Sequence, residues 1–290
     1  MTTTTSTYLA VSQNLTRYQT MTADQPAVKT ASEYYAANIG KVTSIQDFVG
    51  NYRLLSYALD AYGLGNEVNS TALVTQVLEG GVTNPKALAN TLSNPNWAKF
   101  AAAFNFVGQG AASVSTPSAV KTTTSDYVEQ RLESNQGAQD QGVQLALYFQ
   151  RVAPTVSTGM AIMGDVNLLD VVQTIFGLPP ETAGTNIDAE AAIISKLVPT
   201  STLQDPTKLQ QLTERFTAMY DSTYGPGGTG AATPLTVSND GASTAPVLAA
   251  TTILTNLINA NGSASGSLTS AAASFSDALV SSLQGLTLGG

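Results

Sequence analysis

Three pairs of acidic residues stand close enough in the sequence to share a site: Glu129 with Glu133, Asp165 with Asp170, and Asp188 with Glu190. Two carboxylates that flank a cleft, with their pKa values held apart, are what hydrolysis of a glycosidic bond requires. Each pair also has a structural interpretation, because acids are favoured as helix caps, near helix N-termini and on solvated helix faces. We expect the structural interpretation to hold. A hydrolase that uses carboxylates alone is the weakest of the functional alternatives.

The composition excludes most other catalytic chemistry. The 290 residues include no cysteine and no histidine, which rules out disulfides, Cys/His zinc sites, thiol nucleophiles and histidine-based triads. Gly225-Pro-Gly-Gly-Thr-Gly230 matches G-x-G-x-x-G, but no strand is expected before it and no helix after it. Asn239-Asp-Gly241 is too short for a calcium loop. We therefore expect no cofactor, no metal site and no enzymatic activity.

The charge pattern narrows the possible partners. The net charge is −8, and no two of the 12 Lys and Arg residues are adjacent, so we expect no binding to a nucleic-acid backbone. The apolar runs are far shorter than the roughly 18 residues of a membrane span. The N-terminus has neither the basic nor the apolar region of a Sec signal peptide. If the protein is exported, we expect a route that does not use such a signal.

The elements that position these residues are predicted to be helices. A capping residue followed by proline indicates a helix start, and a glycine after a periodic apolar stretch indicates a helix end. The predicted starts are Asn84-Pro85, Asn94-Pro95, Asp205-Pro206 and, less closely, Asp24-Gln25-Pro26; the predicted ends are Gly40, Gly63 and Gly177. No run shows the sustained alternation of a strand. The sequence thus predicts an all-α protein.

The helical body repeats itself. A shift of 114 residues places residues 34–64 on residues 148–178 without a gap, with identities that include Tyr34/Tyr148, Gly50/Gly164 and Gly63/Gly177. Further on, Asn84-Pro85 matches Asp205-Pro206, and Phe100 with Phe104 matches Phe216 with Tyr220. We predict two tandem helical repeats rather than a long solenoid, which needs three or more units. The expected parts are an N-terminal helical segment (1–23), repeat 1 (24–110), a linker (111–124), repeat 2 (125–221) and a C-terminal tail (222–290).

Several aromatic side chains in the first repeat allow two interpretations. They are Tyr34, Tyr35, Phe48, Tyr52, Tyr57 and Tyr62. They could line a binding groove, or they could pack between helices, and aromatic residues at helical spacing favour the core. Trp97 either closes the core or anchors a partner, and the sequence does not distinguish the two.

The tail has a different composition from the body. It is rich in Ala, Ser, Thr and Gly, and from residue 222 onward its only charged residues are Asp240 and Asp277. Two stretches carry apolar residues near heptad spacing, which predicts amphipathic helices that become ordered on a partner. The candidate partner-binding residues are Val247, Leu248, Ile253, Leu254, Leu257, Leu268, Phe275, Leu279 and Leu283. We expect the N-terminal stretch, residues 8–22, to be the partner of this tail.

Four strings in the first repeat carry a family resemblance. They are Glu33-Tyr-Tyr-Ala-Ala-Asn-Ile-Gly-Lys-Val-Thr-Ser-Ile-Gln-Asp-Phe48, the segment 54–64, the segment 77–93 and Phe100-Ala-Ala-Ala-Phe-Asn-Phe106. In order and spacing they resemble a domain of unknown function called DUF1217, over most of residues 17–106. The resemblance implies an alphaproteobacterial protein encoded among flagellar genes. It implies no catalytic residues.

These observations lead to two expectations about function. The first is a non-enzymatic structural component of a bacterial flagellum or a flagellum-associated assembly, extracellular, with flagellar proteins or copies of itself as partners. The alternative is a cytoplasmic adaptor or chaperone-like module for flagellar export, in which the repeats bind a partner helix. The location of the protein distinguishes them.

Overall fold

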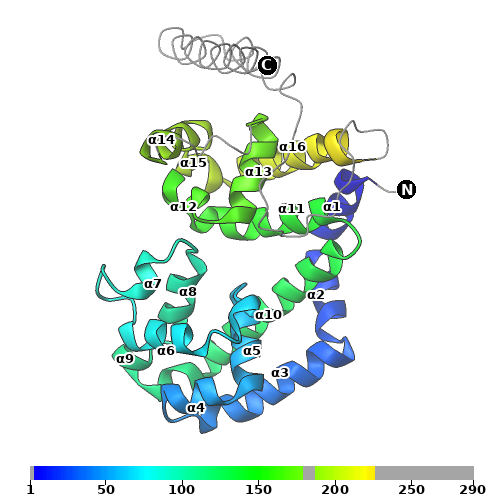
Figure 1. Ribbon diagram of the computed structural model, residues 1–290. Helices are drawn as coiled ribbons and strands as arrows, with labels where there is room; N and C mark the ends of the chain where they lie inside the picture. The colour runs from blue at the N-terminus through cyan, green and yellow to red at the C-terminus, as the bar shows by residue number, and fades with distance from the viewer. Residues whose placement is uncertain (1–2, 179–186, 226–290) are drawn as a thin grey trace, which may run out of the picture. The chain divides into compact units, whose positions relative to one another are not determined.

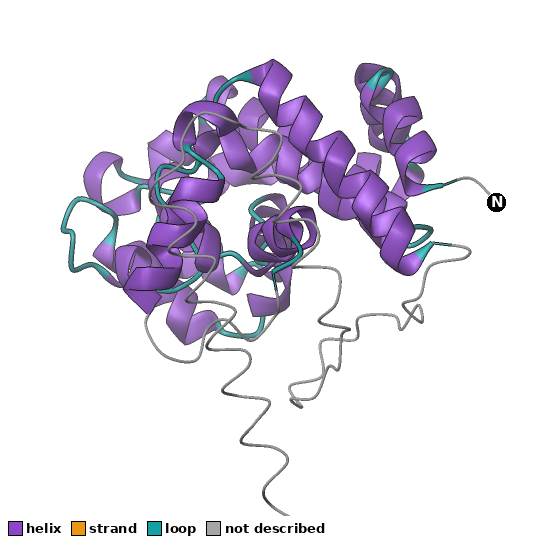
Figure 2. Cartoon of the chain, turned by 90° about the horizontal axis from the view of Figure 1, so that it is seen from above, coloured by secondary structure: helices purple, strands orange, loops and turns teal. Residues whose placement is uncertain are grey.

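The computed structural model describes residues 3–178 and 187–225, and within these ranges every regular element is a helix (Figures 1 and 2). The all-α prediction is confirmed. None of the described helices is long and apolar enough to cross a membrane. The tail after Gly225, with its nine candidate partner-binding residues, lies outside the described residues.

The chain before the longest helix forms short helices joined by tight turns. They are α1 (Thr4–Ser12), α2 (Leu15–Ala23), α3 (Pro26–Asn38), the 3₁₀ helix η1 (Ile39–Lys41), α4 (Ile45–Gly50), α5 (Tyr52–Ala61), η2 (Gly65–Glu67), α6 (Thr71–Gly80), α7 (Leu88–Thr91), α8 (Asn96–Ala103), α9 (Phe106–Gln109) and η3 (Ala111–Ser115).

The rest of the described chain begins with a 21-residue helix. The elements are α10 (Pro117–Gly137), α11 (Gln141–Val152), η4 (Ala153–Thr155), α12 (Gly159–Met163), α13 (Val166–Phe176), α14 (Ile187–Leu197), α15 (Thr200–Leu203) and α16 (Pro206–Tyr224).

Most of the predicted helix starts are observed, and one is wrong. Helix α3 begins at Pro26, α8 begins one residue after Pro95, and α16 begins at Pro206 with the Asp205 side chain as its cap. No helix begins at Pro85. Instead, Asn84 Oδ1 accepts from the backbone N–H of Lys86 at 2.9 Å, which closes a turn. Asparagine and proline serve turns as well as caps, so the dipeptide alone does not distinguish them.

Two of the three predicted glycine stops are confirmed. Gly63 and Gly177 follow α5 and α13 with φ values of 71° and 61°, a conformation that strongly favours glycine at a helix C-terminus. The backbone N–H of Leu64 closes the first of these ends onto the carbonyl of Leu59 at 2.8 Å. The prediction for Gly40 is wrong, because that residue lies within η1, which continues directly from α3.

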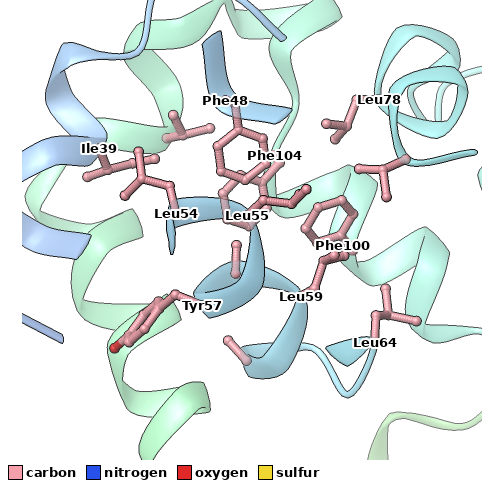
Figure 3. Packing of buried hydrophobic residues seen from close by; sticks show 14 of the residues in the cluster. Ile39, Phe48, Leu54, Leu55, Tyr57, Leu59, Leu64, Leu78, Phe100 and Phe104 are labelled. Atoms are coloured by element: carbon pink, nitrogen blue, oxygen red, sulfur yellow. The ribbon is translucent and has the colours of Figure 1, made fainter. Parts of the chain in front are cut away.

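The core of the first helices is aromatic (Figure 3). Phe48 of α4 stacks on Phe104 with ring centroids 5.0 Å apart, and Tyr35 of α3 stacks on Tyr57 of α5 at 4.6 Å. Trp97, 4% exposed, also lies in this core. The prediction that these aromatic residues pack in the core is therefore confirmed for Tyr35, Phe48 and Tyr57. Of the two interpretations of Trp97, the structure supports the one in which it closes the core.

Helix α10 replaces the expected linker. Residues 117–124 form its first turns, capped by Thr116, whose hydroxyl accepts from the backbone N–H of Ala119 at 3.2 Å. The helix packs against α2, α3 and α5 on one part of its length and against α11 on another. The Tyr127 ring stacks on Tyr57 at 3.9 Å. Within the described ranges, the residues before Phe176 and after residue 186 belong to one compact unit, and the division into two repeats stays a prediction.

The N-terminal segment contains two helices, and α1 is packed into this unit. It contacts α11 and α16, with Tyr8 and Val11 fully buried. The backbone N–H groups of Thr4 and Thr5 donate to the two carboxylate oxygens of Asp221, at 2.7 and 3.0 Å. The apolar side of α1 is therefore covered by the body, and the tail that is expected to pair with residues 8–22 lies outside the described residues.

Two stretches have the same order of elements. The series α3–η1–α4–α5 is followed 114 residues later by α11–η4–α12–α13, and both η helices start at equivalent positions. The α-helices after each series also correspond in order: α6, α7 and α8 with α14, α15 and α16. Helices α7 and α15 have four residues each. By this order Asp205-Pro206 corresponds to Asn94-Pro95, not to Asn84-Pro85 as the sequence match suggested. An origin by duplication stays a prediction.

Candidate functional site

A cluster of ionised side chains joins α10 to α11. Two of the three nitrogens of the Arg151 guanidinium donate to the Glu133 carboxylate: Nε to Oε1 at 2.6 Å and Nη2 to Oε2 at 2.9 Å. Glu129, one turn earlier on α10, lies 3.8 Å from Arg151 Nε. Burial raises the pKa of Glu133 and of Glu129, and Arg151 opposes the shift in both. The Glu129/Glu133 pair is thus a buried ion-pair network rather than a solvated helix face.

Asp126 and Lys99 lie at the edge of this cluster. Burial, together with the negative charge of Glu129, raises the pKa of Asp126 to about 6. Burial lowers the pKa of Lys99, and Asp165 opposes that shift. A carboxyl group with a pKa near 6 is suited to general acid catalysis if it faces a substrate. Asp126 does not line the neighbouring polar cavity, so its carboxyl group would not face a substrate bound in that cavity.

A polar cavity of about 470 Å³ lies beside the cluster. Helices α10 and α11, the start of α13 and the turn before α8 form its walls. Its lining consists mainly of amide, hydroxyl and carboxylate side chains: Gly63, Ser93, Asn94, Asn96, Gln130, Glu133, Gln141, Gln144, Leu145, Tyr148, Gly164, Asp165, Val166 and Asn167. Amides both donate and accept hydrogen bonds. The cavity is suited to holding polar backbone or side-chain groups.

Asp165 has the capping role expected of it. Its Oδ1 accepts from the backbone N–H groups of Asn167 and Leu168 at the start of α13, each at 3.1 Å. Its Oδ2 accepts from the Tyr148 hydroxyl at 2.5 Å. Burial and the Asp165 carboxylate raise the pKa of Tyr148.

Asp170 does not join Asp165 in a catalytic pair. Its charge acts on Tyr220 and Tyr224 of α16, where it adds to the effect of burial in raising the pKa of each tyrosine. Asp165 is instead saturated by Tyr148 and by backbone N–H groups. Two carboxyl groups with different surroundings do not form the facing acid/base pair that a glycosidase needs.

Asp188 and Glu190 both lie in the first turn of α14, where the helix dipole favours acids. This position agrees with the structural interpretation of the pair. Asp188 is exposed and Glu190 is buried. Across residues 3–178 and 187–225, no three His, Cys, Asp or Glu side chains come together as metal ligands.

An open hollow of about 550 Å³ lies over α4 and the start of α5. It is lined by Tyr34, Gln46, Asp47, Gly50, Asn51, Tyr52 and Arg53. The Arg53 guanidinium carbon lies 3.6 Å from the centroid of the Tyr34 ring, and Tyr52 is 62% exposed. The core interpretation is therefore wrong for Tyr52, which points outward because it occupies the first position of α5 beside its cap. No motif in the sequence indicates this hollow.

The fold and these sites define an all-helical protein whose buried charges connect its helices. The family model described as "Protein of unknown function (DUF1217)" matches residues 61–209. The crystal structure of protein AGR_C_984 from Agrobacterium tumefaciens is similar, with 38% sequence identity and a TM-score of 0.70, over 74% of this chain and 91% of that chain. No curated protein matches the chain. The chain belongs to the DUF1217 family; the match overlaps the sequence resemblance over residues 61–106, continues to residue 209 and does not include residues 17–60.

Proposed function

We propose that this protein is a non-enzymatic structural component of a bacterial flagellum or of an assembly associated with it. The observation that carries the proposal is that the candidate acids, where the structure describes them, pair with a cation between helices or lie at helix starts. Glu129 and Glu133 hold Arg151 between two helices. Asp165 caps α13, and Asp188 lies at the exposed start of α14. These acids connect or terminate helices, as expected of a protein that serves as a building block.

Family resemblance supplies the flagellar part of the proposal. The strings at residues 33–48 and 77–93 resemble those of proteins that occur mainly in alphaproteobacteria, where many are encoded among flagellar genes. In this proposal the partners are flagellar proteins or further copies of the chain.

Deletion of the gene tests the proposal. We expect flagella that are absent, shortened or misassembled in electron micrographs, together with reduced swimming in soft agar. Expression of the chain from a plasmid should restore both properties. Normal flagella and normal swimming in the deletion strain would count against a structural role.

A further inference from the structure

The cavity beside α13 is closed by a turn from the earlier part of the chain. Residues 93–96, between α7 and α8, form this turn, and Asn94 Oδ1 closes it by accepting from the backbone N–H of Asn96 at 2.9 Å. The carbonyl of Ser93 lies directly against Gly164, where a Cβ atom would collide with it. Gly164 is therefore required by the close approach of a neighbouring backbone.

Five residues that line the open hollow stand 114 positions before five residues that line the closed cavity. The pairs are Tyr34 and Tyr148, Gly50 and Gly164, Asn51 and Asp165, Tyr52 and Val166, and Arg53 and Asn167. The internal bond is also repeated: the Tyr34 hydroxyl donates to Asn51 Oδ1 at 3.5 Å, as the Tyr148 hydroxyl does to Asp165 Oδ2. The burial differs, because Tyr148 and Asp165 are covered by the turn, whereas Tyr34 and Asn51 are half-buried.

Gly50 has no structural requirement within the chain. A Cβ atom built on it meets nothing within 4 Å, and its φ is not positive. A glycine in a helix costs stability relative to alanine. Its counterpart Gly164 makes room for a backbone carbonyl. No carbonyl from residues 3–178 or 187–225 lies in the equivalent place at Gly50, so the same use there requires one from elsewhere.

The chain has a second turn of the kind that covers Gly164. Residues 204–207, between α15 and α16, correspond to residues 93–96 by element order. Asp205 Oδ1 accepts from the backbone N–H of Thr207 at 3.0 Å, as Asn94 does from Asn96. Gln204, Pro206 and Thr207 are exposed. This turn is therefore presented outward with its geometry already fixed.

The charges of the second turn and the open hollow are complementary. At the closed junction, Asn94 of the turn and Asn167 of the cavity are both neutral. Their counterparts are Asp205 and Arg53, an anion and a cation. Arg53 lies over the Tyr34 ring, and Asp205 Oδ2 has only a weak local pairing, 3.7 Å from Lys208 Nζ. Complementary charges across an interface favour one register and one partner.

We propose that the turn at residues 204–207 of one copy docks into the hollow around Gly50 of a second copy, with Asp205 paired to Arg53. The contact is head-to-tail, so each copy keeps one free turn and one free hollow, and further copies add to form a chain or a ring. This inference rests on the proposed function, since it names the partner within a structural assembly.

Sedimentation velocity of the full-length chain over a concentration series tests the proposal. The wild type should form a ladder of species that grows with concentration. Arg53→Glu opposes Asp205 with a like charge, and Asp205→Lys does the same to Arg53. Each variant alone should weaken self-association by about tenfold or more. A mixture of the two restores opposite charges at every junction, so it should associate as the wild type does.

Two further variants separate the interface from the fold. Gly50→Ala should keep or raise the melting temperature and still weaken association, because its Cβ occupies space that only the partner needs. Lys86→Glu makes the same charge change as Arg53→Glu at an exposed residue outside both surfaces, and it should have no effect. A wild type that stays monomeric throughout, or a mixture that fails to restore association, would overturn this proposal. Either result leaves the flagellar proposal to be decided by the deletion strain.

Discussion

The Tyr148 hydroxyl donates to Asp165 Oδ2 at 2.5 Å, while the Tyr34 hydroxyl, 114 residues earlier, donates to Asn51 Oδ1 at 3.5 Å in a half-buried setting. The Tyr148–Asp165 pair is buried beneath the turn at residues 93–96, whereas the Tyr34–Asn51 pair lines the open hollow. The chain thus uses one local arrangement in two environments.

Removal of the two caps should therefore have unequal costs. Asp165→Ala loses the α13 cap and leaves the buried Tyr148 hydroxyl without its acceptor, so we expect a loss of about 2–4 kcal/mol in the free energy of unfolding. Asn51→Ala should cost about 1 kcal/mol, because the Tyr34 hydroxyl lies near solvent. Urea denaturation followed by circular dichroism measures both. Equal losses would show that burial of the Tyr148–Asp165 pair contributes nothing to the cost.

The Arg151 network should be costly to break from one side. Arg151→Met leaves Glu133 buried without its cation, and we expect a loss of about 3–5 kcal/mol. The double variant Arg151→Met/Glu133→Gln should recover much of this, since the most buried charge of the network is removed together with its cation. Arg131→Met is the matched control: its partner Asp60 is 27% exposed, so we expect about 1 kcal/mol or less. A double variant no more stable than the single one would contradict this account.

Sequence analysis predicted the helices and their caps well, because these signals are local. It missed the continuity of α10, because Lys121-Thr-Thr-Thr-Ser125 has weak helix propensity. Burial of Thr123, Tyr127 and Val128 against neighbouring helices outweighs that propensity.

Long-range contacts account for the parts of the candidate sites that were not predicted. Arg151 is 18 residues from Glu133, so nothing local reveals that they pair. The open hollow also had no motif of its own. It becomes recognisable only when Gly50 is compared with Gly164, which requires knowing that Ser93 covers one and that nothing covers the other.

Asp126 should make stability depend on pH. Its pKa is about 6 in the folded protein because of burial and the neighbouring Glu129, against an ordinary value of 3.8. The folded state therefore holds this proton more tightly than the unfolded state, and the contribution to stability is lost as the pH rises from about 4 to 6. Arg151 and Lys99 oppose the shift. Asp126→Asn should remove this component, on the order of 1–2 kcal/mol.

The measurement is the difference in unfolding free energy between Asp126→Asn and the wild type at pH 4, 5 and 6. The variant should gain stability relative to the wild type as the pH rises. Parallel curves would show that the Asp126 carboxyl group titrates normally.

The two equivalent glycines should respond oppositely to alanine. Gly164→Ala places a Cβ against the Ser93 carbonyl, and we expect a loss of about 1–3 kcal/mol. Gly50→Ala meets open space and a helical backbone, so it should be neutral or gain up to about 1 kcal/mol. Thermal unfolding at low protein concentration, where self-association is negligible, compares the two. A substantial loss for Gly50→Ala would mean that Gly50 has a role within the single chain.

The most direct test of the structural-component account is the location of the protein. Flagella sheared from intact cells and the remaining cell lysate should be compared by quantitative mass spectrometry. The chain has no Lys or Arg after Arg215, so a second protease is needed to follow the tail. We predict that the protein is enriched in the flagellar fraction together with known axial proteins. Recovery in the cytosolic lysate alone would contradict the account and favour an export adaptor.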